Sequence, residues 1–204
     1  MHDQIVCMSI MCYAFHWGGE GRHEPCAHGS VTEAALLASD VWQHSSSRDQ
    51  CLCLLQAYDD LEHFETPFVA KLHRFTPLAE PQAVFTFHHP NKSEHIDNSR
   101  CCQLSFEASA HPGICHGFAG YFDAVLYKQV HLSILPSTHT PNMSSWFPIY
   151  FPIQQPVQLL ADQPLELGVW RCGANHKVWY EWCVTYPQCS GIHNPNGRSY
   201  FVGL

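Results

Sequence analysis

Cysteine and histidine are the residues with the widest chemical repertoire in this chain, which contains 11 Cys and 16 His among 204 residues. Four such side chains can hold a tetrahedral zinc ion. A candidate set lies near the N-terminus, at Cys12, His16, His23, Cys26 and His28, but its spacing matches no zinc-finger pattern. We therefore favour the interpretation that this segment is exposed and poorly ordered, and we expect no metal site.

Catalytic signatures are also missing from the sequence. A Cys–His hydrolase needs one activated thiol beside a histidine and an orienting group, and the sequence selects no such pair. It contains no G-x-S-x-G elbow, no Walker loop and no H-E-x-x-H motif. The glycine cluster at 18–21 follows no convincing strand and opens no helix, so it does not indicate a nucleotide site. We expect no catalytic, cofactor-binding or metal-binding residue.

Charge and hydropathy exclude two classes of partner. The formal net charge is −8, and the 10 Lys and Arg residues are spread singly, so no basic stripe is available to neutralise nucleic-acid phosphates. No apolar run reaches the roughly 18 residues that a membrane-spanning helix needs. We therefore expect neither a nucleic-acid-binding surface nor a membrane span.

The redox environment has two interpretations. Eleven cysteines and two glycosylation sequons, which begin at Asn91 and Asn142, are compatible with a secreted, disulfide-linked, all-β binding module. Against this, the cysteine count is odd, and residues 1–17 have neither the basic start nor the cleavage site of a signal peptide. We favour reduced cysteines and an intracellular protein.

The elements that would position any site fall in the second part of the chain. Residues 1–56 show no sustained hydrophobic period and at most one short helix, from Val31 to Trp42, so we expect a largely irregular extension. Residues 57–204 alternate apolar and polar side chains, which predicts half-buried antiparallel strands. The clearest alternation occurs at 84–88, 102–107, 130–134, 165–169 and 178–185.

Turns and prolines separate these predicted strands. Residues 172–175 favour a hairpin and 194–197 a tight turn. Six prolines between 136 and 164 indicate that strands there are short or at a sheet edge. Strand periodicity places Trp170, Trp179 and Trp182 in the core. The fold class is all-β, as a sandwich or a barrel.

Several segments carry a more specific signal. They are HGFAGYFD at 116–123, SSWFPIYFPI at 144–153, KVWYEW at 177–182 and IHNPNGRSYFVGL at 192–204, with FTFHHPN at 85–91 upstream. Together they closely resemble the C-terminal end of the type II protein arginine methyltransferases, the protein arginine N-methyltransferase 5 family, over residues 57–204. No part of 1–56 shows the resemblance.

The resemblance implies an antiparallel β-barrel used for oligomerisation and substrate binding. In this family a separate Rossmann-like domain holds S-adenosylmethionine and the paired catalytic glutamates. We therefore expect this chain to bind no S-adenosylmethionine and to be inactive by itself. The resemblance also implies cytoplasmic and nuclear localisation, arginine-containing substrates such as histones and RNA-binding proteins, and association with itself or with full-length methyltransferase subunits. The alternative function is that of a non-catalytic regulator that pairs with the full-length methyltransferase.

One loop of the family's substrate channel has a counterpart here. Ser145, Trp146 and Phe147 match the barrel loop that reaches the substrate arginine, so the resemblance implies that they bind substrate. An aromatic face attracts a guanidinium by stacking and cation–π interaction. Residues 65–100 have two interpretations: Phe68, Phe75, Phe85 and Phe87 form an arm that reaches a neighbouring subunit, or they fill the barrel.

Overall fold

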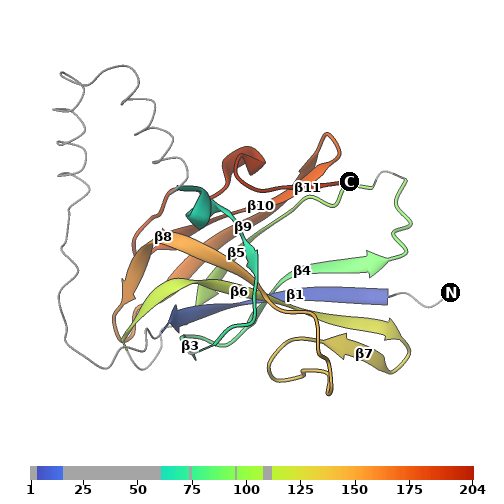
Figure 1. Ribbon diagram of the computed structural model, residues 1–204, viewed down its shortest axis with the longest axis horizontal. Helices are drawn as coiled ribbons and strands as arrows, with labels where there is room; N and C mark the ends of the chain where they lie inside the picture. Colours follow the sequence, from blue (N-terminus) through green and yellow to red (C-terminus); the bar gives the residue numbers. More distant parts are fainter. Residues whose placement is uncertain (1–3, 16–60, 74, 95, 108–111) are drawn as a thin grey trace. The chain divides into compact units, whose positions relative to one another are not determined.

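A computed structural model describes residues 4–15, 61–73, 75–94, 96–107 and 112–204 of the protein. Contacts divide the chain into two units, and the fold described here belongs to the unit made of Met1–His16 and Phe64–Leu204. This unit consists of antiparallel strands and the 3₁₀ turn η1 (Pro195–Gly197), and its residues 64 and 65 are the end of a helical segment that begins at residue 61 (Figure 1). No helix in the described part is long and apolar enough to cross a membrane.

The strands form two sheets. The larger sheet has the order β2-β8-β6-β1-β3, with β4 also paired to β1 and β7 to β6. The smaller sheet has the order β11-β10-β9-β5. The strand bounds are β1 Gln4–Phe15, β2 Phe68–Val69, β3 Phe75–Pro77, β4 Gln82–His89, β5 Arg100–Phe106, β6 Gly113–Tyr127, β7 Val130–Ser133, β8 Ile149–Leu159, β9 Leu165–Ala174, β10 Lys177–Tyr186 and β11 Val202–Gly203.

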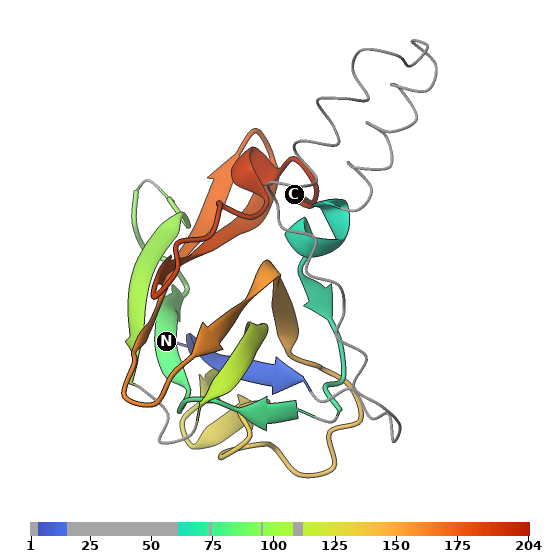
Figure 2. The ribbon, with the colours of Figure 1, turned by 90° about the vertical axis from the view of Figure 1, so that its left-hand side faces the viewer.

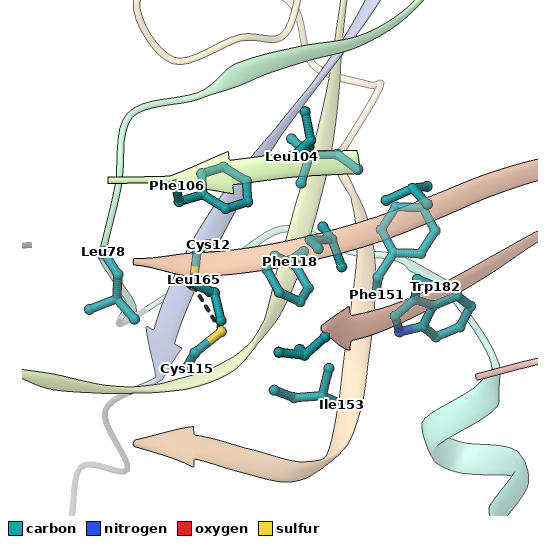
Figure 3. Packing of buried hydrophobic residues seen from close by; sticks show 14 of the residues in the cluster. Cys12, Leu78, Leu104, Phe106, Cys115, Phe118, Phe151, Ile153, Leu165 and Trp182 are labelled. Carbon is teal, nitrogen blue, oxygen red and sulfur yellow. Dashed lines mark hydrogen bonds between the residues drawn. The ribbon is translucent and has the colours of Figure 1, made fainter. Parts of the chain in front are cut away.

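The main core fills the space between the two sheets. Phe118 and Phe151 of the larger sheet are almost completely buried, as are Leu167 and Trp182 of the smaller one, and all belong to one apolar cluster. Figure 2 shows the orange-red strands of the smaller sheet across from blue β1, and Figure 3 shows the side chains between them. The sheets are thus held together by apolar burial, the main driving force of folding.

Strand β1 lies inside the larger sheet. It pairs with β6 from Ile5 to Tyr13 on one edge and with β4 and then β3 on the other. Ile10 and Cys12 face the main core, whereas Met11 and Tyr13 enter a second apolar cluster on the opposite face of the sheet. The prediction that residues 1–56 are largely irregular is therefore wrong for residues 4–15.

The reason for this error is that β1 is buried on both faces. Its sequence, QIVCMSIMCYAF, is an almost continuous apolar run, without the alternation by which a half-buried strand is recognised. Strand β6 was missed for the same reason, since its residues 117–121 are all buried. The proposed helix from Val31 to Trp42 lies outside the described residues, and the domain boundary at residue 57 stays a prediction.

The prediction of an antiparallel all-β fold is confirmed. All five segments with clear alternation are strands, as β4, β5, β7, β9 and β10. The predicted hairpin joins β9 to β10 through Asn175 and His176, both at positive φ, as in a type I′ turn. Residues 195–197 form η1. Among the described residues, however, the strands divide between two sheets and no closed barrel is found.

The prediction for the proline-rich region, of strands that are short or at a sheet edge, holds in its second form for β8. This strand extends over 11 residues and contains Pro152 and Pro156 beyond the part that pairs with β2. It tolerates them because β2 pairs only with Ile149 and Tyr150, and because its pairing with β6 is irregular between Val157 and Pro152.

Of the three tryptophans predicted to lie in the core, one does and two do not. Trp182 is a core residue, and its indole Nε1 donates to Pro152 O at 2.7 Å. Trp170 and Trp179 are only half-buried and lie on the other face of the smaller sheet. There, Trp170 covers Gly168 and Trp179 packs on Gly197.

A polar network fixes the C-terminal segment against the smaller sheet. Buried Asn194 donates to Tyr180 O and Tyr200 O and accepts from the backbone N–H of Ser199 and Tyr200. Buried Glu65 forms a two-point ion pair with Arg198 and accepts from the Ser199 hydroxyl. Burial raises the pKa of Glu65, but these hydrogen bonds and the Arg198 charge outweigh it, so the pKa is lowered and the carboxylate stays ionised.

His193 belongs to the same segment and is buried in its neutral form. Its ring stacks on Trp182 with a centroid distance of 5.4 Å, and Nε2 accepts from the Gln154 backbone N–H at 3.1 Å. A proton on Nε2 would remove that acceptor. Burial lowers the pKa of His193 below its usual 6.5.

The position of β1 makes its core residues essential for stability. We predict that Ile10→Ala, at a fully buried position, lowers the free energy of unfolding by about 2–5 kcal/mol. Ile96→Ala is the matched control, because Ile96 is 64% exposed, and should change stability by less than about 0.5 kcal/mol. Urea denaturation measures both. Equal, small effects would mean that β1 does not belong to the cooperative unit.

The buried histidine makes stability pH-dependent. Because the folded-state pKa of His193 lies below the unfolded value, the unfolded chain binds this proton first, and stability falls as pH drops through about 6.5. Each kcal/mol lost lowers the melting temperature by about 2–4 °C in a domain of this size. Thermal melts at pH 7.5 and 5.5 should show a larger drop for the wild type than for His193→Gln. The same drop in both would assign the pH dependence to other groups.

Candidate functional site

The loop predicted to bind substrate lies between β7 and β8. Trp146 has a φ of 72°, in the left-handed region that bulky residues rarely adopt. Its side chain is 61% exposed, and that of Phe147 is 41% exposed. Strain of this kind persists where the surroundings hold it, and it often marks a functional position. The loop thus carries two aromatic rings that are exposed and not buried in the core.

Both rings line a groove of about 460 Å³. The other lining residues come from six strands and from the segment that follows β7. They are Val6 and Met8 of β1, Val69 of β2, Phe87 of β4, Gly120, Tyr121 and Phe122 of β6, Ile134 after β7, Ile149 of β8 and Tyr180 of β10. The groove therefore exists only when segments distant in the sequence are assembled.

Specific contacts set the shape of the groove. The ring of Trp146 meets that of Phe122 edge to face, with centroids 5.6 Å apart. Gly120 leaves room for the groove walls, since a Cβ there would lie 2.7 Å from Met8 Cε and 2.9 Å from Ile149 Cγ2. Phe122 of the larger sheet thus supports the loop by contact with Trp146, and the side chains of Met8 and Ile149 occupy the space beside Gly120.

The groove has no charged side chain among its described lining residues. The hydroxyl of Tyr121 is hydrogen-bonded to that of Tyr13, and burial raises the pKa of Tyr121, so it stays neutral. Positive charge lies next to one lining residue, since the guanidinium carbons of Arg100 and Arg171 are each 5.4 Å from the centroid of the Phe87 ring. Chemically, this lining can bind flat or apolar groups and cations through aromatic faces, but it offers no general acid or base.

The structure brings together only part of the predicted site. Trp146 and Phe147 are in the groove, whereas exposed Ser145 is not among its lining residues. Of the zinc candidates, Cys12 is buried beside Cys115, and the other four lie outside the described residues. No group of three or more His, Cys, Asp or Glu within the described part could hold a metal ion.

Most of the groove is not predictable from the sequence pattern. The pattern predicts an irregular extension around Val6 and Met8, and no strand around Phe122. Motif spacing alone gave no signal for these residues, because their convergence depends on the pairing of β1 with β6 and β4. A strand prediction for each continuous apolar run would have been needed first.

For Phe85 and Phe87, the structure distinguishes between an arm that reaches a neighbouring subunit and aromatic rings that fill the domain. Phe85 is 4% exposed and belongs to the main core, and half-buried Phe87 packs against it. These rings fill the domain and do not form an arm. Phe68 differs, because it is 40% exposed on the two-residue edge strand β2.

Comparisons with known proteins agree with this architecture. The model of the PRMT5 oligomerisation domain matches residues 34–202. Protein arginine N-methyltransferase 5 of Oryza sativa subsp. indica is 57% identical over 152 residues, which is 74% of this chain and 23% of the rice protein. The Xenopus laevis protein of the same name is 51% identical over 152 residues, covering 74% of this chain and 24% of the frog protein.

More distant proteins show the same relationship. Protein arginine N-methyltransferase skb1 of Schizosaccharomyces pombe is 42% identical over 170 residues, or 72% of this chain and 27% of the yeast protein. The crystal structure of PRMT6 superposes with a TM-score of 0.50 at 12% identity, over 89% of this chain and 54% of that one, which shows similarity of fold alone. The chain spans about a quarter of the length of the curated relatives.

Proposed function

The chain belongs to the protein arginine N-methyltransferase 5 family, whose oligomerisation domain it contains, and from this we propose that it binds substrate arginine through the aromatic groove at Trp146. The observation that carries the proposal is the exposed Trp146 ring, held in a left-handed conformation at the edge of an uncharged groove. A guanidinium is planar and weakly hydrated, so it stacks readily on such a ring. Phe147 adds a second aromatic surface beside it.

We propose that the chain supplies binding and not methyl transfer. S-adenosylmethionine carries a sulfonium charge and ribose hydroxyls, and nucleoside cofactors of this kind are usually held by an acidic side chain. The groove offers none among its described lining residues, so it does not fit the cofactor. Methylation to symmetric dimethylarginine would then belong to a full-length type II methyltransferase with which this chain associates.

We propose self-association, or association with full-length methyltransferase subunits, as the second part of the function. The family match to an oligomerisation domain supports it. Exposed apolar side chains are available at Phe64, Phe68 and Val69, which are 36%, 40% and 68% exposed. Burial of exposed apolar groups favours association. Histones and RNA-binding proteins as substrates, and a cytoplasmic and nuclear location, remain proposals from family membership.

We also propose that the two sheets of this domain can join into the predicted β-barrel. Strands β4 and β5 are neighbours at the junction of the two sheets, where the Gln82 side chain donates to Ser105 O at 2.8 Å. Continuous pairing of β4 with β5 would join the sheets along one side.

Substrate binding at Trp146 is testable with peptides. We predict that an arginine-containing peptide binds the purified chain more tightly than its lysine counterpart, because a guanidinium stacks better on an indole. Trp146→Leu should weaken binding of the arginine peptide about fivefold, which corresponds to about 1 kcal/mol of cation–π attraction. Titration calorimetry measures both affinities.

The control for this experiment is Tyr186→Leu, which removes an exposed aromatic ring outside the groove. Its affinity for the arginine peptide should equal that of the wild type. Unchanged affinity in Trp146→Leu, or an equal loss in Tyr186→Leu, would contradict the assignment of the groove.

Association is testable by sedimentation velocity over a series of concentrations. We predict that the wild type self-associates and that Phe68→Ser weakens this, because it removes an exposed apolar ring that association would bury. Val130→Ser is the control, since Val130 is 51% exposed on a different strand. Circular dichroism must show that both variants fold. A wild type that is monomeric throughout and does not bind full-length methyltransferase would overturn this part of the proposal.

A further inference from the structure

Two cysteines from different strands meet in the main core. Cys12 of β1 and Cys115 of β6 are both completely buried, and the Cys12 thiol donates to Cys115 Sγ at a distance of 2.8 Å (Figure 3). The two residues are 103 positions apart in the sequence. A disulfide bond is about 2.0 Å long, so the two sulfur atoms need to approach by about 0.8 Å to form one.

The surroundings of the pair favour thiols over thiolates. Burial raises the pKa of the Cys12 thiol, and the hydrogen bond to Cys115 raises it further. Polar groups around the pair include the Gly117 carbonyl, which accepts from Cys115 Sγ at 3.6 Å, and the Tyr13 backbone, which is hydrogen-bonded to Cys12. The pKa of the Tyr150 hydroxyl is raised first by burial and then by both thiols. A buried thiol of this kind is unreactive while the core stays closed.

A bond between these two cysteines would join β1 covalently to β6. Strand β1 lies outside the family match, which begins at residue 34, and yet it supplies part of both apolar clusters. In the reduced protein, β1 is held to the described part of the domain by strand pairing and packing. A covalent link at Cys12 would fasten this strand to β6.

We propose that Cys12 and Cys115 are a redox-sensitive pair whose oxidation to a disulfide locks β1 into the larger sheet. The oxidant is a peroxide. One thiolate attacks a peroxide oxygen and breaks the O–O bond, which gives a sulfenic acid and one molecule of water or alcohol. The second thiol displaces the sulfenic oxygen as water and forms the S–S bond. In total, two S–H bonds are lost, one S–S bond forms, and the peroxide is reduced by two electrons.

Access to the pair requires β1 to open. Because neither sulfur is exposed, the reaction should be slow well below the unfolding transition and faster near the melting temperature, where the unfolding that frees β1 becomes populated. The exposed thiols of Cys101 and Cys189 should react without such opening. The order of oxidation therefore distinguishes a buried pair from general surface oxidation. The proposal is independent of the groove and of self-association.

The test is peptide mapping of the full chain under non-reducing conditions, after mild peroxide treatment a few degrees below the melting temperature. We expect a Cys12–Cys115 cross-linked peptide within a single chain, removed by dithiothreitol. A disulfide that closes so long a loop should raise the melting temperature by about 5–10 °C. Cys115→Val should lose both the cross-link and the shift, while the control Cys101→Ser should keep both.

Three results would overturn the proposal. In the first, Cys12 and Cys115 both remain thiols when the exposed cysteines are fully oxidised. In the second, the Cys12–Cys115 link appears only in a covalent dimer, so that the strand is not locked within its own chain. In the third, the intrachain link forms without any rise in melting temperature. The mapping of the wild type decides the first two outcomes even if Cys115→Val does not fold.

Discussion

The burial of β1 on both faces of the larger sheet is the constraint on which the rest of the structure depends. Its residues enter both apolar clusters, and its edges pair with β6 on one side and with β4 and β3 on the other. Without this strand, β6 and β4 would lose their common neighbour. The same strand contributes Val6 and Met8 to the aromatic groove, so the integrity of the fold and the shape of the candidate site have one physical origin.

The groove is held from two directions. From the larger sheet, Phe122 meets the ring of Trp146, and Gly120 lets Met8 and Ile149 come together. From the smaller sheet, Tyr180 reaches the groove, and its carbonyl accepts a hydrogen bond from buried Asn194. The network of Asn194, Glu65 and Arg198 thus orders the strand that carries Tyr180. An aromatic site of the kind proposed here for a guanidinium benefits from such rigid support.

The sequence allowed the half-buried strands to be predicted, because alternation at β4, β5, β9 and β10 is a direct consequence of one face meeting the core and one meeting solvent. It also allowed Trp146 and Phe147 to be identified, through the family resemblance. It did not reveal β1 and β6, whose apolar residues face both sides, nor the length of β8, where a pairing irregularity accommodates proline. Strand periodicity predicted a core position for three tryptophans, but only Trp182 lies on the core face, and Trp170 and Trp179 lie on the other face of the smaller sheet. Ser145 matched the motif, yet it lies outside the groove lining.

Hydrogen exchange at the amides of β1 tests the central claim most directly. If β1 is an integral strand of the larger sheet, the amides of Met8 to Cys12 that pair with β6 or β4 should exchange only through global unfolding, with the same free energy as those of β9 and β10. Exchange of these β1 amides at rates close to those of an unstructured peptide, while β9 and β10 stay protected, would contradict the account.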